Sequence, residues 1–189
     1  MVQVVLTGIR TVNQLLTAGI AITAFSLLLY ALTFNLRDRV ARSFAIVLTC
    51  VVIVFVSEAI GSTAGTAQDL ELWLRLQWIG IIFLPTAYLH FSDALLATTG
   101  KPSRGRRRLA VRLTYLISLA FLIALPTSLL VGGIVENGTP TPHLRRTALT
   151  WVFSAYYVVS IAISFVNFWR ASQRAVTRAS QRRMRYLLG

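Results

Sequence analysis

A few ionisable side chains interrupt the long apolar stretches of this sequence. Glu58 lies near the end of one stretch and Arg75 near the start of the next, with only residues 63–71 between the two stretches. Charged side chains are costly inside a bilayer and are usually paired or functional there. We expect Glu58 and Arg75 to lie at similar depth and to form an ion pair or hydrogen bond. That pair could clamp two helices, or Glu58 could form an outward-facing ligand or proton site.

A second polar group lies further along the same stretch as Arg75. Thr86, His90 and Asp93 are spaced i, i+4 and i+7, which places them on one face of a helix. His90 follows Leu72 by about 27 Å along a helix axis, near the opposite membrane boundary. We expect Asp93 to lie within reach of His90. An Asp–His pair can relay a proton or respond to pH, and it can equally hold a helix against its neighbour.

Other chemistries are disfavoured by the residues that the chain contains. His90 and His143 are its only histidines, and His143 falls in a predicted loop, so a bis-histidine haem site is not expected. The sequence has no Cys/His cluster that suits zinc, no phosphate-binding P-loop and no GxSxG nucleophile motif. We therefore predict no catalytic, cofactor-binding or metal site.

The elements that position these groups are predicted to be membrane helices. Hydrophobic residues make up 56% of the 189 residues and charged residues only 13%, and the mean hydropathy is +0.67. Continuous apolar runs of ~20 residues indicate helices that cross a bilayer, whereas strands would alternate polar and apolar residues. We predict an all-α integral membrane bundle of five transmembrane helices, followed by a basic juxtamembrane helix. The spans are expected at residues 13–34, 43–62, 72–98, 111–135 and 148–169.

Two prolines, Pro85 and Pro126, fall inside the third and fourth predicted spans. Proline removes a helix hydrogen bond, and membrane helices tolerate it because neighbouring groups satisfy the freed carbonyl. We expect both prolines to kink their helices, with a moving hinge as the alternative. The single cysteine, Cys50, excludes an intrachain disulfide.

The formal net charge of +13 would suit a nucleic-acid-binding protein if the basic residues formed one soluble patch. Instead, most of them follow the first, third and fifth predicted spans, which end on the same side of a five-span bundle. Cytoplasmic segments carry the excess of Lys and Arg, so we expect the N-terminus outside and the C-terminus in the cytoplasm. Anionic lipid headgroups, and not nucleic acid, are then the expected partners. The basic residues on this side are Arg37, Arg39, Arg42, Lys101, Arg104, Arg106, Arg107, Arg108, Arg112, Arg170, Arg174, Arg178, Arg182, Arg183 and Arg185.

Residues 170–189 are predicted to be a basic cytoplasmic segment or the start of a sixth helix. Arg170, Arg174, Arg178 and Arg182 recur every four residues, so they would form one slowly turning ridge on a continued helix. The ridge could fix the topology at the lipid headgroups. Alternatively, it could act as a lever that passes motion to a cytoplasmic transmitter domain.

The third predicted span is the most distinctive part of the sequence. Residues 73–80 (WLRLQWIG), then Leu84-Pro85 and residues 89–91 (LHF), resemble a helix of the N-terminal seven-transmembrane input region of bacterial sensor histidine kinases. Residues 182–188 (RRMRYLL) resemble the entry to the sixth helix of that region. The likeness runs from about residue 13 to the end of the chain.

This resemblance implies a membrane-embedded sensory input module of a two-component system, in the bacterial inner membrane. The chain stops where a sixth helix would begin and contains no kinase core, so we expect no enzymatic activity from it. It could form a homodimer. The alternative function is an accessory or anchoring subunit of a larger membrane complex. A transporter is disfavoured because the middle of each span lacks a charged pathway.

Overall fold

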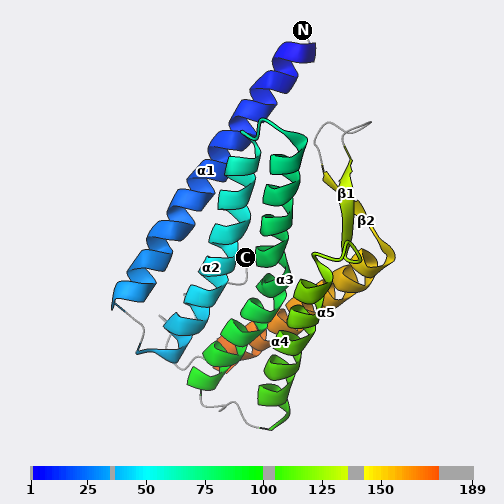
Figure 1. Ribbon diagram of the computed structural model, residues 1–189. Helices are drawn as coiled ribbons and strands as arrows, with labels where there is room; N and C mark the ends of the chain where they lie inside the picture. Colours follow the sequence, from blue (N-terminus) through cyan, green and yellow to red (C-terminus); the bar gives the residue numbers. More distant parts are fainter. Residues whose placement is uncertain (1, 35–36, 100–104, 136–142, 175–189) are drawn as a thin grey trace.

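The computed structural model describes residues 2–34, 37–99, 105–135 and 143–174, which form five helices and one short hairpin (Figure 1). The hairpin lies between the fourth and fifth helices, and its two strands pair antiparallel. The predicted all-α membrane bundle is confirmed, and the hairpin is an addition to it. The elements are α1 (Val2–Phe34), α2 (Arg39–Gly61), α3 (Ala67–Thr98), α4 (Arg106–Ala124), β1 (Val131–Val135), β2 (His143–Arg146) and α5 (Ala148–Arg174).

Four of the described helices, α1, α2, α3 and α5, are long and apolar enough to cross a membrane. The remaining helix, α4, has 19 residues, and arginines occupy four of its first seven positions. Its charge-free part, residues 113–124, spans ~18 Å, which is shorter than a hydrocarbon core of ~30 Å. The apolar part of α4 is therefore shorter than the fourth span predicted from the sequence, residues 111–135.

The predicted fourth span, 111–135, is wrong in its second half. α4 ends at Ala124, because Pro126 has no backbone N–H with which to continue the helical hydrogen bonds. Ser128 then adopts a positive φ of 59° and turns the chain. Residues 131–135 (VGGIV) combine β-branched side chains with two glycines, which favours a strand over a helix. Pro126 therefore ends its helix, whereas Pro85 lies inside α3.

α3 is the central helix of the bundle. It packs against α2, α4 and α5, whereas α1 packs mainly against α2 at one edge (Figure 1). The helices alternate in direction along the chain, and the hairpin lies at the end opposite the α3–α4 connection (Figure 1). A polar group on α3 can therefore reach partners on three other helices.

The contact between α2 and α3 is closest at Gly80. A Cβ atom at this position would lie 2.6 Å from the carbonyl oxygen of Cys50 and 2.7 Å from Cγ2 of Val54. Real side chains do not approach a backbone so closely, so only glycine fits. Small residues of this kind are the usual means by which membrane helices come together.

α1 contacts α2 through one narrow stripe of buried residues. Their spacing alternates between four and three, which is the pattern of a coiled-coil seam. The lower part of the stripe packs on Ala45 and Leu48 of α2. The large apolar side chains on the other faces of α1 are exposed, which suits a helix surrounded by lipid. The stripe consists of Thr17, Ala21, Ala24, Leu28 and Ala31.

Candidate functional site

Three helices meet at one buried carboxylate near one end of the bundle. Asp93, near the end of α3, has a side chain that is only 3% exposed. Nη2 of Arg107, in the first turn of α4, lies 2.5 Å from Oδ1 of Asp93 and donates to its backbone carbonyl at 3.1 Å. Nη2 of Arg39, the first residue of α2, lies 3.7 Å from Oδ2. We refer to Arg39, Asp93 and Arg107 as the inner triad.

Local backbone features hold the two arginines of the inner triad in place. Asp38 caps α2, since its side chain accepts a hydrogen bond from the backbone N–H of Val40 at 3.2 Å and so fixes the turn that carries Arg39. Gly105, with a φ of 53°, turns the chain into α4 just before Arg107. Because the carboxylate is buried, loss of its arginine partners would leave an uncompensated charge.

His90 lies one turn before Asp93 on α3 but contacts a different partner. Its Nδ1 lies 3.1 Å from the hydroxyl of Tyr115 in α4, and the two rings pack edge to face with centroids 5.9 Å apart. The expected His90–Asp93 pair is therefore replaced by two separate contacts, because arginines occupy the carboxylate. Thr86, His90 and Asp93 all lie on the face of α3 that contacts α4.

Thr86 belongs to a buried cluster of hydroxyl groups, the hydroxyl cluster, that joins α3, α4 and α5. Its Oγ1 lies 2.8 Å from Oγ of Ser118 and 2.6 Å from the hydroxyl of Tyr156. Ser118 also donates to the carbonyl of Ile82 at 2.9 Å, and Tyr156 donates to that of Thr114 at 3.1 Å. Such hydrogen bonds hold membrane helices together in a defined register.

Sequence reasoning singled out Thr86 but missed Ser118 and Tyr156. Serines and tyrosines are common in membrane helices, and nothing in their spacing shows which of them face one another across three helices. Polar residues of α5 also contribute to packing, since Ser160, Ser164 and Asn167 are buried. Asn167 also donates to Oγ of Ser92 on α3 at 3.2 Å.

Arg75 lies at the opposite end of the bundle and fastens α3 to the end of α4. Its guanidinium pairs with Glu71, one turn earlier, at 2.8 Å. It also donates to the carbonyl of Leu125 at 2.9 Å and to Oγ of Ser128 at 3.2 Å. A cation at the end of a helix is favourable because unpaired carbonyls lie there.

The predicted ion pair between Glu58 and Arg75 is wrong. Oε2 of Glu58 instead accepts a hydrogen bond from Gln77 at 3.4 Å, which still links α2 to α3. Glu71 is four residues from Arg75 on the same helix, where side chains are neighbours, and so takes the guanidinium.

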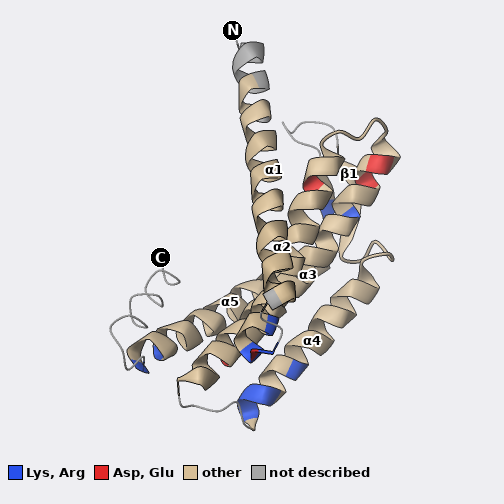
Figure 2. Ribbon diagram, turned by 90° about the vertical axis from the view of Figure 1, so that its left-hand side faces the viewer, with Lys and Arg blue, Asp and Glu red and all other residues tan. Residues whose placement is uncertain are grey.

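Basic residues gather at the end of the bundle that holds the inner triad. Figure 2 shows basic ribbon segments where α4 begins and α5 ends, and acidic segments at the other end. Of the predicted ridge, Arg170 and Arg174 are exposed in the last two turns of α5, whereas Arg178 and Arg182 lie outside the described residues. Within the described residues, no group of three His, Cys, Asp or Glu side chains could hold a metal ion.

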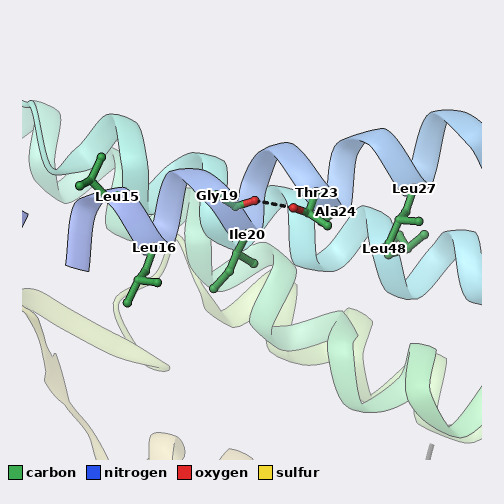
Figure 3. A pocket seen from close by; sticks show the side chains of 8 residues that line it. All are labelled: Leu15, Leu16, Gly19, Ile20, Thr23, Ala24, Leu27 and Leu48. Atoms are coloured by element: carbon green, nitrogen blue, oxygen red, sulfur yellow. Dashed lines mark hydrogen bonds between the residues drawn. The ribbon is translucent and has the colours of Figure 1, made fainter. Parts of the chain in front are cut away.

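An open apolar groove of about 430 Å³ runs along α1 (Figure 3). The hydroxyl of Thr23 donates to the carbonyl of Gly19 in the same helix at 2.8 Å. The lining is otherwise apolar and suits contact with lipid chains. It consists of Leu15, Leu16, Gly19, Ile20, Thr23, Ala24, Leu27 and Leu48.

Comparison with known proteins agrees with this architecture. Residues 16–189 match the family described as the N-terminal 7TM region of histidine kinase. No curated protein and no solved structure matches the chain. The match extends from within α1 through the inner triad and α5, and four of the described helices can cross a membrane. The chain is thus a multi-pass membrane protein, and it belongs to the family of N-terminal seven-transmembrane regions of histidine kinases.

Proposed function

We propose that this chain is the signal-input module of a two-component system in a bacterial inner membrane, and that it catalyses no reaction itself. Its family supports the input role. The inner triad is the observation that carries the proposal, because one buried carboxylate connects three helices at the basic end of the bundle. A displacement of any of these helices changes the environment of that carboxylate.

The basic end of the bundle is proposed to face the cytoplasm, with the N-terminus outside. The positive-inside rule supports this orientation, since Arg39, Arg42, Arg107, Arg108 and Arg174 all lie at that end. The antiparallel course of α4 beside α3 supports a return of the chain toward the outer face before α5 begins (Figure 1). Anionic lipids are the proposed partners of the basic residues, together with a cytoplasmic transmitter domain.

In this proposal, α4 carries the signal along α3. The outer end of α4 is held by Arg75, its middle by the hydroxyl cluster and its inner end by Arg107. A stimulus that moves the hairpin or the α4 end would shift these three contacts together, because packed interfaces switch between discrete arrangements. The exposed arginines at the end of α5 then pass the change to the transmitter.

Recovery of a phosphorylated histidine tests the function. The chain would be tagged in its native host, solubilised and incubated with ATP, and acid-labile histidine phosphorylation of the recovered material would be measured. We expect phosphohistidine in the tagged polypeptide or in a protein recovered with it, and a changed level in Asp93→Asn. A stoichiometric complex with no phosphohistidine would instead support the accessory-subunit function.

Reporter fusions test the orientation separately. Alkaline phosphatase is active only outside the cytoplasm, so we expect activity for a fusion after residue 64 and none for a fusion after residue 103. Reversal of the two results would overturn the proposed orientation.

A further inference from the structure

Positive charge exceeds negative charge around the inner triad. Asp93 supplies one carboxylate to both Arg39 and Arg107. Arg42, one turn after Arg39 on α2, is exposed, and both arginines lie within electrostatic reach of His90. Asp38, next to Arg39, adds a second carboxylate, so Arg39, Arg42 and Arg107 still exceed the acidic groups by one charge, and this excess attracts an anion.

The two arginines of the triad are held unequally. Arg107 lies 2.5 Å from the carboxylate, and its side chain is 23% exposed. Arg39 lies 3.7 Å away and is 46% exposed. Arg39 can therefore turn toward a second anion while Arg107 keeps Asp93 paired.

The position of these residues in the bundle indicates which anion is within reach. Arg39 is the first residue of a helix that can cross the membrane, so it lies at headgroup depth. Ile46, one turn beyond Arg42 on α2, is a partly exposed apolar side chain, as is Leu32 near the end of α1. An acyl chain can lie against such side chains while its phosphate meets the guanidinium groups, which bind phosphate through paired N–H donors.

We propose that Arg39 and Arg42 bind the phosphate of an anionic phospholipid, and that this phosphate competes with Asp93 for Arg39. Lipid occupancy then loosens the link between α2 and α3, while Arg107 keeps α3 joined to α4. This inference rests on the proposed function only in assigning the lipid to the cytoplasmic leaflet.

Native mass spectrometry of the full chain tests the site. The protein would be released from nanodiscs that contain equal amounts of phosphatidylglycerol and phosphatidylcholine, and the dissociation constant of each retained lipid would be measured. The test variant is Arg39→Gln/Arg42→Gln. The matched control is Arg145→Gln/Arg146→Gln, which removes the same charge from exposed arginines of β2.

The wild type and the control are expected to bind phosphatidylglycerol equally and in preference to phosphatidylcholine. The test variant should bind it about 25-fold more weakly, at about fivefold for each arginine. The Asp93→Asn variant should bind it more tightly, because Arg39 is released from its competitor. If Arg39→Gln/Arg42→Gln does not fold, Arg39→Lys/Arg42→Lys keeps the charge but loses the paired donors, and weaker binding is again expected.

Three results would overturn the proposal. Equal loss of phosphatidylglycerol in both double variants would mean that it responds to net charge alone. Displacement of the lipid by 10 mM inorganic phosphate would identify a soluble phosphate as the ligand. An unchanged affinity of Asp93→Asn for phosphatidylglycerol would show that the lipid and Asp93 do not compete for Arg39. The measurement needs no kinase activity, so its failure leaves the phosphohistidine test of the proposed function unaffected.

Discussion

The two sides of this bundle are held together by different forces. The α1–α2 contact is a seam of alanine, leucine and one threonine, and the hydroxyls of Thr23, Ser26 and Thr33 bond to carbonyls of α1 itself. The contacts of α3 with α4 and α5 include the Asp93–Arg107 pair, the hydroxyl cluster and the Arg75 contacts. The first side relies on close packing, whereas the second relies on polar groups that must find partners.

This difference indicates where the bundle can tolerate movement. When small apolar residues separate, lipid chains can replace the lost contact, because they are as apolar as the side chains. A buried ion pair or hydrogen bond is either formed or broken, and its loss exposes an unpaired group to an apolar environment. The contacts of α3 with α4 and α5 should therefore switch between discrete arrangements. The contact of α1 with α2 should adjust to whichever arrangement is present.

Removal of the Asp93 carboxylate should produce the largest loss of stability. In Asp93→Ala, the partly buried guanidinium of Arg107 loses its compensating charge, and the expected cost is at most about 3–5 kcal/mol. Unfolding by SDS in mixed micelles measures it. The control is Asp69→Asn, an exposed residue of the first turn of α3. An equal, small loss of stability in both variants would contradict the claim that polar contacts hold α3 against α4 and α5.

A side chain at Gly80 should have the next largest effect. Gly80→Val places a Cβ atom against the Cys50 carbonyl and forces α2 away from α3, at a cost of about 1–3 kcal/mol. Gly19→Val in α1 is the matched control, because a Cβ atom there meets nothing within 4 Å. Thermal denaturation in detergent should separate the two variants, and similar melting temperatures would refute the close approach.

Each hydroxyl of the hydroxyl cluster should contribute less to the free energy of unfolding than Asp93 or Gly80. We expect Thr86→Val and Tyr156→Phe each to cost about 0.6 kcal/mol, and at most ~1.7 kcal/mol. The double variant should lose less than the sum of the single variants, because the two hydroxyls bond to each other. SDS unfolding of all four proteins forms the double-mutant cycle. Strict additivity would mean that the two groups act independently.

Loss of a hydroxyl on α1 should have the smallest effect. Thr23→Val removes a hydrogen bond within the same exposed helix, so the expected change is within about 0.5 kcal/mol. The same unfolding assay applies. A cost as large as that of Thr86→Val would erase the contrast between the two sides.

The sequence predicts the helices far better than the partners of their polar groups. Hydropathy locates α1, α2, α3 and α5 because each is a long apolar run, and it fails after Ala124 because Pro126 and the glycines of β1 leave the run apolar but not helical. Turn chemistry overrides hydropathy there.

For the candidate site, too, the sequence predicts the position of the polar groups on a helix but not their partners. The spacing of Thr86, His90 and Asp93 correctly indicates a shared face of α3. It cannot indicate that Arg39 and Arg107, which the sequence assigns to loops and headgroups, reach Asp93. Long arginine side chains extend well beyond the depth of their own backbone, so their position along the chain underestimates their reach.

The short distance along the chain between Asp93 and Arg107 affects how the protein is made. A ribosome that adds about 5–20 residues per second synthesises the arginine within about 3 s of the aspartate. Arg39 precedes the aspartate in the chain, so both basic partners of Asp93 are synthesised before α5 begins.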